Sequence, residues 1–218
     1  IGAILALGKL VPASLGYRLA DWAATFLAGQ RDAPMIRAAR ANQWVVTGQR
    51  LNAEELDEQV HANVRCVARI LYDFYHTIDH YDAILQRVTL SPQLIHLLKT
   101  RLGGSEGTLM LAPHLSNFDL AGRAIALNGY CIQVLSYPQP QGGYEWQNRL
   151  RSDMGIEITP MTTENMRRAK ERLRAGGGVI SGLERPLSAT NYYPKFFGCP
   201  APLPVSYVRM ALQTGCAV

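Results

Sequence analysis

The segment APHLSNFDLAG, at 112–122, places a histidine and an aspartate five positions apart between two apolar runs. Acyl transfer to a hydroxyl needs a neutral imidazole to remove the proton and a carboxylate to fix its tautomer and stabilise the imidazolium. No protein nucleophile is needed when the acyl donor is an activated thioester. The segment therefore suggests that His114 and Asp119 form a catalytic pair, because a turn between them would bring the carboxylate to the imidazole.

The same segment has a purely structural interpretation. Ser116 and Asp119 fit a capping box, in which the serine bonds the first free amides of a helix and the acid reaches back. This interpretation explains Asp119 but not His114, and the two interpretations are compatible within one turn. An acid five places after one of five histidines is a common coincidence, so the spacing alone is weak evidence for catalysis.

The surrounding pattern predicts the elements that position these residues. Helices are expected between 13 and 80, with Asn52 capping an amphipathic helix whose first turn holds Glu54 and Glu55. Strands and helices are then expected to alternate. The expected strands are 83–90, 108–113, 131–137, 156–161 and 179–184, and the expected helices are 91–104, 117–129, 143–155, 163–178 and 203–215.

Such alternation indicates an α/β fold with a mostly parallel sheet covered by helices. Ligands bind outside the carboxyl ends of the strands in such sheets, and His114 follows one of these ends. We expect a single structural domain, with an N-terminal helical region at 1–80 and an α/β core at 81–218.

Composition narrows the class of protein. Of the 218 residues, 48% are hydrophobic, which excludes a disordered chain, and only 18% are charged. The net charge of +5 favours acidic partners such as phospholipid head groups, phosphorylated cofactors or nucleic acid. The four cysteines are far apart, so neither a zinc site nor a disulfide framework is indicated, and a reducing cytoplasm is expected.

The first 29 residues are apolar but poor in long uncharged runs. Pro12 and Gly16 interrupt them, and no uncharged run reaches the roughly 18 residues that a spanning helix needs. Two alternatives remain, an amphipathic helix in the membrane interface or a first helix packed in a core. Because the sequence opens on Ile1 and closes on what reads as the entry to a strand, we expect it to be truncated at both ends.

The segment HLSNFD resembles the H-x4-D/E motif of the glycerolipid acyltransferase superfamily. More specifically, it is similar to that of the bacterial lipid A biosynthesis acyltransferases and the related phosphatidylinositol mannoside acyltransferases. The likeness extends over roughly 10–218 and includes NRLRSDMGIEITPM, GLERP and FFG. It implies a glycerol-3-phosphate acyltransferase-like α/β/α sandwich with a membrane-associated N-terminal helical region. One departure is Tyr137, where relatives often carry a nearby glutamate.

The resemblance also implies a function, the transfer of a fatty acyl chain from acyl-CoA or acyl carrier protein to a glycolipid hydroxyl. The acceptor would be a lipid A precursor or a phosphatidylinositol mannoside, at the cytoplasmic face of the bacterial plasma membrane. We expect an anionic membrane surface as a partner. We expect no cofactor, metal or nucleic acid. The implied roles are His114 as general base, Asp119 as its partner, and Asn117, Arg151, Glu184 and Arg185 as substrate-binding residues.

Several alternatives stay open at this point. Water in place of the hydroxyl would make the chain a thioesterase or lipid-ester hydrolase. A non-catalytic protein would bind anionic membranes through its apolar N-terminus and the basic helix at 163–178. Nucleic acid is a weaker partner, because aromatic residues are not interleaved with the basic ones. His76 and His80, four apart on a helix, suit a polar helix end better than a metal site.

Overall fold

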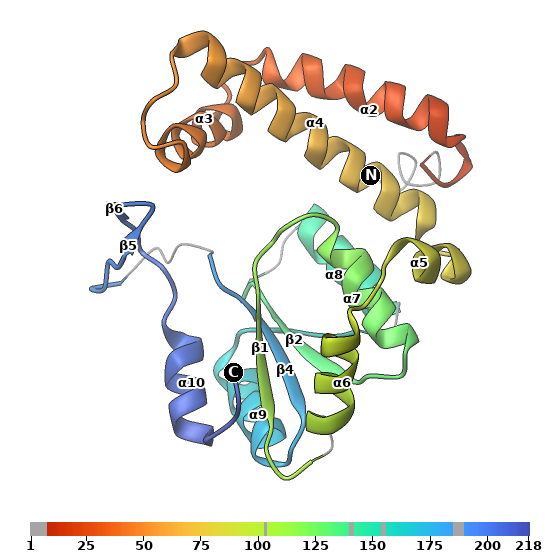
Figure 1. Cartoon of the computed structure of the whole chain (residues 1–218), viewed down its shortest axis with the longest axis vertical. Helices are drawn as coiled ribbons and strands as arrows, with labels where there is room; N and C mark the ends of the chain where they lie inside the picture. Colours follow the sequence, from red (N-terminus) through yellow and green to blue (C-terminus); the bar gives the residue numbers. More distant parts are fainter. Residues whose placement is uncertain (1–7, 103, 140–141, 154–155, 185–189) are drawn as a thin grey trace. The chain divides into compact units, whose positions relative to one another are not determined.

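The computed structural model of the chain describes residues 8–102, 104–139, 142–153, 156–184 and 190–218 (Figure 1). Its contacts divide the chain into two compact units. The first unit contains residues 1–79 and 194–201, and the second contains residues 80–193 and 202–218. Among the described residues, no helix combines the length and apolar character needed to cross a membrane.

Three helices form most of the described part of the first unit. They are α2 (Ala13–Ala28), α3 (Pro34–Val46) and α4 (Ala53–Thr77). The predicted cap of α4 is confirmed: the Asn52 side chain accepts the N–H groups of Glu54 and Glu55, and the Glu55 carboxylate accepts the N–H of Asn52 at 2.9 Å. The small core of the unit contains Ala24, Ile36, Val60 and Val64.

Helix α2 packs closely along α4. Gly16 permits this approach, because a Cβ there would lie 2.1 Å from the Tyr72 ring. Asp21 accepts two hydrogen bonds from Arg69, at 2.6 and 2.5 Å. The short strands β5 (Lys195–Phe196) and β6 (Cys199–Pro200) pair antiparallel as a hairpin, and their residues group with this unit.

The second unit is organised around four parallel strands in the order β1-β4-β2-β3. The strands are β1 (Thr108–Ala112), β2 (Ile132–Ser136), β3 (Glu157–Pro160) and β4 (Gly178–Gly182). The helices are α5 (Tyr81–Arg87), α6 (Pro92–Arg101), α7 (Phe118–Leu127), α8 (Gly143–Asp153), α9 (Thr163–Arg174) and α10 (Ser206–Thr214). Ala217 also pairs with Thr108, on the side of β1 away from β4.

Helices cover both faces of this sheet (Figure 1). On one face, Leu109, Leu135 and Val179 pack with residues of α9 and α10. On the other face, Ile132 and Ile180 meet residues of α7. This alternation along the strands is what period-two side-chain geometry requires. The predicted α/β sandwich with a parallel sheet is therefore confirmed.

One predicted strand is wrong. Residues 83–90 were expected to form a strand, but most of them belong to the helix α5. Ile84 is completely buried while Leu85 is 46% exposed, and Asp82 and Arg87 lie at the helix ends that favour their charges. A short apolar window does not separate strand from helix by its periodicity, and here packing decided the outcome.

Candidate active site

The strand order brings His114 and Glu184 together. Strands β1 and β4 are neighbours, and Ala112 is directly opposite Gly182. His114 and Glu184 each follow their strand end by two residues, so they leave the sheet at the same level. Seventy residues of sequence separate the two, and the parallel pairing closes that gap.

His114 and Glu184 are joined by two contacts. One carboxylate oxygen of Glu184, Oε1, accepts the backbone N–H of His114 at 3.0 Å and also contacts Nδ1 of the imidazole. Burial raises the pKa of the Glu184 carboxyl. The hydrogen bonds from His114 and the nearby imidazole lower the pKa by a larger amount, so the net pKa lies below the ordinary value. An ionised carboxylate only accepts hydrogen bonds. In the neutral imidazole Nδ1 therefore carries the proton, and the free lone pair is on Nε2.

The His114 ring is fixed by its packing. Gly182 lies against the ring, since a Cβ added there would be 2.9 Å from its Cε1 atom. Phe118 contacts the ring edge to face, with the ring centroids 4.8 Å apart. The side chain is still 33% exposed. The imidazole is thus held in place and open to a substrate.

Asp119 does not contact the imidazole in this structure. Its carboxylate accepts hydrogen bonds from Nε and Nη2 of Arg151, at 2.6 and 3.0 Å, and from Gln147 at 3.2 Å. Asp119 and Arg151 are 9% and 8% exposed, so this is a buried, bidentate ion pair. The position that the sequence assigned to Asp119, beside His114, is taken by Glu184.

The start of α7 accounts for this difference. Ser116 has a positive φ of 50° and does not cap the helix, so the predicted capping box is wrong. The cap is Asn117, whose side chain accepts the N–H of Leu120 at 3.4 Å. Asp119 therefore enters the first turn of α7 with its carboxylate directed to α8. The predicted substrate contact of Asn117 stays a prediction.

Arg151 belongs to a polar network that the sequence did not reveal. Its Nη1 donates to Asn148 at 3.0 Å, and Asn148 contacts the Ser136 hydroxyl at 3.4 Å. Its guanidinium also lies 5.7 and 5.9 Å from the ring centroids of Phe118 and Tyr144. This network couples α8 to α7 and to the end of β2, whereas the sequence placed Arg151 against substrate. Arg185, the remaining predicted substrate residue, lies outside the described residues.

Comparison with known proteins agrees with this architecture. The sequence profile of a family described as bacterial lipid A biosynthesis acyltransferase matches residues 1–218. The chain belongs to this acyltransferase family. It is also similar to phosphatidylinositol mannoside acyltransferases of Mycobacterium tuberculosis strain H37Rv and of Mycolicibacterium smegmatis. The first is 29% identical over 146 residues, which are 65% of this chain and 46% of the relative. The second is 26% identical over 125 residues, which are 56% and 41%. The matched parts span less than half the length of these relatives.

The basic helix α9 of this family member is paired within the chain. Arg167 contacts Glu164 and Glu171, and Glu157 contacts both Arg168 and Arg172. Arg174 donates to a backbone carbonyl of α10. These contacts favour the interpretation of α9 as a solvated surface of ion pairs over its interpretation as a binding surface for anionic lipid.

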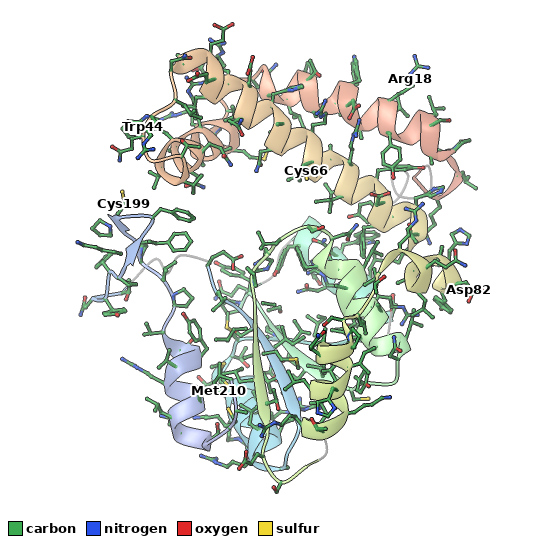
Figure 2. All side chains as sticks on the ribbon, in the orientation of Figure 1. Arg18, Trp44, Cys66, Asp82, Cys199 and Met210 are labelled. Carbon is green, nitrogen blue, oxygen red and sulfur yellow. The ribbon has the colours of Figure 1, made fainter. Side chains whose placement is uncertain are left out.

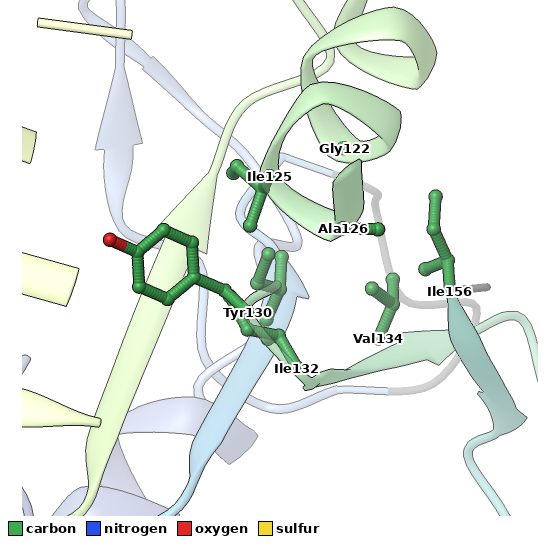
Figure 3. A pocket seen from close by; sticks show the side chains of 8 residues that line it. Gly122, Ile125, Ala126, Tyr130, Ile132, Val134 and Ile156 are labelled. Atoms are coloured by element: carbon green, nitrogen blue, oxygen red, sulfur yellow. The ribbon is translucent and has the colours of Figure 1, made fainter. Parts of the chain in front are cut away.

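An apolar hollow lies between α7 and the sheet of the acyltransferase core (Figure 3). Its cavity volume is about 20 Å³, which is room for little more than one water-sized group. The lining residues are Gly122, Ile125, Ala126, Tyr130, Ile132, Val134, Ile156 and Ile180. Figure 3 shows the side chains of Val134 and Ile156 directed toward α7.

Four residues of the site were not predicted from the sequence, namely Ser136, Gln147, Asn148 and Gly182. Gly182 gave no signal beyond its place at a strand end, while Gln147, Asn148 and Arg151 share one face of a helix at three- and four-residue spacing. That spacing is a usable signal for a polar helix face. Ser136, at the end of β2, joins them only through the strand order.

Proposed function

We propose that the protein is a membrane-associated O-acyltransferase that moves a fatty acyl chain from a thioester donor to a hydroxyl of a glycolipid. The observation that supports this function is the His114–Glu184 pair at the carboxyl ends of two adjacent parallel strands. Ligands of such sheets bind at that edge. Family membership supports the reaction class, and the names of the relatives suggest phosphatidylinositol mannosides or lipid A precursors as acceptors.

In the proposed reaction, Nε2 of His114 removes the proton of the acceptor hydroxyl as its oxygen attacks the thioester carbonyl carbon. Glu184 stabilises the imidazolium that results, through Nδ1. The tetrahedral intermediate then expels the thiolate as the carbon–sulfur bond breaks, and the imidazolium returns the proton to the sulfur. The products are an ester and a free thiol, and no protein nucleophile is acylated.

The donor is acyl-CoA or acyl carrier protein, because both present the acyl group as a thioester. The fatty chain is the apolar part of either donor. No cofactor enters this reaction. The chemistry rests on the imidazole and on Glu184, with the Asp119–Arg151 pair fixing α7 against α8.

The decisive experiment follows labelled acyl chains from acyl-CoA or acyl carrier protein to a phosphatidylinositol mannoside or lipid A precursor. The full-length protein is compared with His114→Ala and with His96→Ala, a change at an exposed histidine of α6. We expect loss of ester formation only in His114→Ala. Ester formation by that variant at the wild-type rate would refute the mechanism. Free fatty acid in place of ester, with acceptor present, would identify a hydrolase.

The proposed membrane contact is the outer face of α2. Leu15, Leu19, Trp22 and Phe26 recur at helical spacing and are 47%, 51%, 70% and 59% exposed. Arg18 flanks them, and Figure 2 shows its side chain extending away from α4. Apolar and aromatic residues with an adjacent cation are typical of a helix that lies in an anionic membrane interface. The proposed location is the cytoplasmic face of the bacterial plasma membrane.

Vesicle sedimentation tests this contact. The wild type is compared with the double variant Trp22→Ser, Phe26→Ser and with Val67→Ser, which changes a half-exposed apolar residue of α4. We expect the double variant to lose binding to vesicles that contain phosphatidylglycerol while Val67→Ser retains it. Equal binding by all three proteins would place the membrane contact elsewhere.

A further inference from the structure

The interior of the described chain carries an unbalanced positive charge. Its buried charged side chains are Asp119, Arg123 and Arg151, at 9%, 8% and 8% exposure. One carboxylate thus accompanies two guanidiniums. Asp119 pairs with Arg151 and accepts a hydrogen bond from Gln147, and it forms no ion pair with Arg123. Among the described residues, no carboxylate lies within ion-pair distance of Arg123.

The surroundings of Arg123 do not supply another anion. Its Nε atom is buried and has no hydrogen-bond partner among the described residues. The guanidinium lies 4.6 Å from the ring centroid of Tyr81, the first residue of α5, which packs beside α7 (Figure 1). Tyr81 is 54% exposed, so the guanidinium lies beneath a surface ring.

A buried cation of this kind needs compensation. Buried carboxyl or amino groups escape the cost by becoming neutral, but a guanidinium keeps its proton in proteins. A ring face attracts a cation, yet it replaces neither the hydration nor the hydrogen bonds that Arg123 has lost. Removing water from a charge without a partner is among the costly arrangements in a fold. A ligand that brings the missing anion would remove this cost.

We propose that Arg123, beneath Tyr81, binds a phosphate group of a substrate. A phosphate accepts paired hydrogen bonds from a guanidinium, and it would neutralise the charge that Asp119 leaves uncompensated. Either substrate of the proposed acyl transfer could supply it, since the nucleotide of coenzyme A and the head group of a phosphatidylinositol-type acceptor both carry phosphate. Assigning the phosphate to a substrate rests on the proposed function, whereas anion binding itself does not.

Binding is tested first, without catalysis. Thermal unfolding of the full-length protein is followed as inorganic phosphate replaces chloride at constant ionic strength. Arg123→Met keeps most of the side-chain volume and removes the charge. Arg168→Met, at an exposed arginine of α9, is the control. We expect phosphate to raise the unfolding midpoint of the wild type and of Arg168→Met. Without phosphate, we expect the unfolding midpoint of Arg123→Met to be at least equal to that of the wild type. We expect the affinity of Arg123→Met for phosphate to be at least about tenfold weaker.

The opposite pattern would overturn the inference. Arg123→Met that is less stable than the wild type and responds equally to phosphate would make Arg123 a structural partner of Tyr81 only. If Arg123→Met does not fold, Arg123→Lys takes its place. A lysine keeps the charge but not the paired donors, so we expect a weaker phosphate response, and an unchanged response would refute paired binding.

Kinetics then identify the source of the phosphate. One arm compares acyl-CoA with an acyl-pantetheine thioester that lacks phosphate, and the other compares the phosphodiester acceptor with its dephosphorylated form. We expect the Arg123 variant to raise the KM of one phosphate-bearing substrate about tenfold and to leave its phosphate-free analogue unchanged. Acyl transfer with no effect of Arg123 on either KM would refute the phosphate site and leave the proposed function intact. Phosphate binding by a protein that transfers no acyl chain would refute the proposed function and leave the phosphate site intact.

Discussion

Replacement of Gly182 by alanine tests the idea that the position of the imidazole, and not only its presence, governs activity. The new Cβ would lie 2.9 Å from Cε1 of His114 and 3.6 Å from Nδ1. Ordinary carbon contacts begin near 3.5 Å, so the ring must move by about 0.5 Å or more. That movement disturbs the contact between Nδ1 and Glu184, since the backbone of both strands is fixed by the parallel register.

The expected effect is large in catalysis and small in stability. Misplacement of a reacting group by about 1 Å can cost roughly 100-fold, so a shift of half that size should lower kcat about tenfold. Stability should fall by less than about 1 kcal/mol, because a partly exposed ring is free to relax. Gly29→Ala is the control, since Gly29 has φ −65° and its Cβ would meet nothing closer than 3.4 Å.

The assay measures acyl transfer at saturating donor together with urea unfolding for the wild type and both variants. Wild-type kcat in Gly182→Ala would refute the reasoning, because the ring would then be displaced without consequence. A parallel loss of kcat and of folding would show that the glycine serves the sheet and not the imidazole.

Three further predictions concern stability. Asp119→Asn should lower the free energy of unfolding by about 3–5 kcal/mol, because it leaves the Arg151 guanidinium buried without a full charge partner. The double variant Asp119→Leu with Arg151→Met should recover much of the lost stability in urea titrations. The pKa of Glu184 is lowered in the folded state, so this carboxylate stabilises the fold above its unfolded pKa near 4.3, and the stabilisation is lost as pH falls through the folded value. The difference in free energy of unfolding between wild type and Glu184→Gln should therefore shrink below about pH 4. Asn52→Ala should cost about 1 kcal/mol through the lost helix cap, measured as a shift of the urea midpoint at constant slope, and an unchanged midpoint would contradict the capping geometry.

Local pattern was enough to predict most of the second unit. The apolar runs at 108–113, 131–137 and 179–184 became β1, β2 and β4, and the helix after each predicted turn was found. These elements carry their own signals, such as strand-length apolar runs and helix stops. Residues 83–90 were predicted as a strand, but this window is too short for periodicity to decide, and in the structure Ile84 is buried in the helix α5, which packs beside α7.

The pairing within the candidate site could not be predicted from sequence. His114 and Asp119 are close in the chain, which suggested that they interact, but the helix cap at Asn117 directs Asp119 to Arg151. Glu184 is seventy positions away, and only the placement of β4 beside β1 makes it the partner of His114. Sequence patterns predict which strands exist but not their lateral order. The site depends on that order.

The strand order also governs when the protein becomes competent. Strand β4 is the last of the four parallel strands in the chain, yet it lies between β1 and β2 and separates strands that the ribosome makes much earlier. Until β4 and Glu184 have emerged, β1 and β2 have open edges, and His114 has no carboxylate on Nδ1. Completion of the sheet and assembly of the base are therefore one event, so a nascent or truncated chain that ends before β4 holds the histidine without the means to use it.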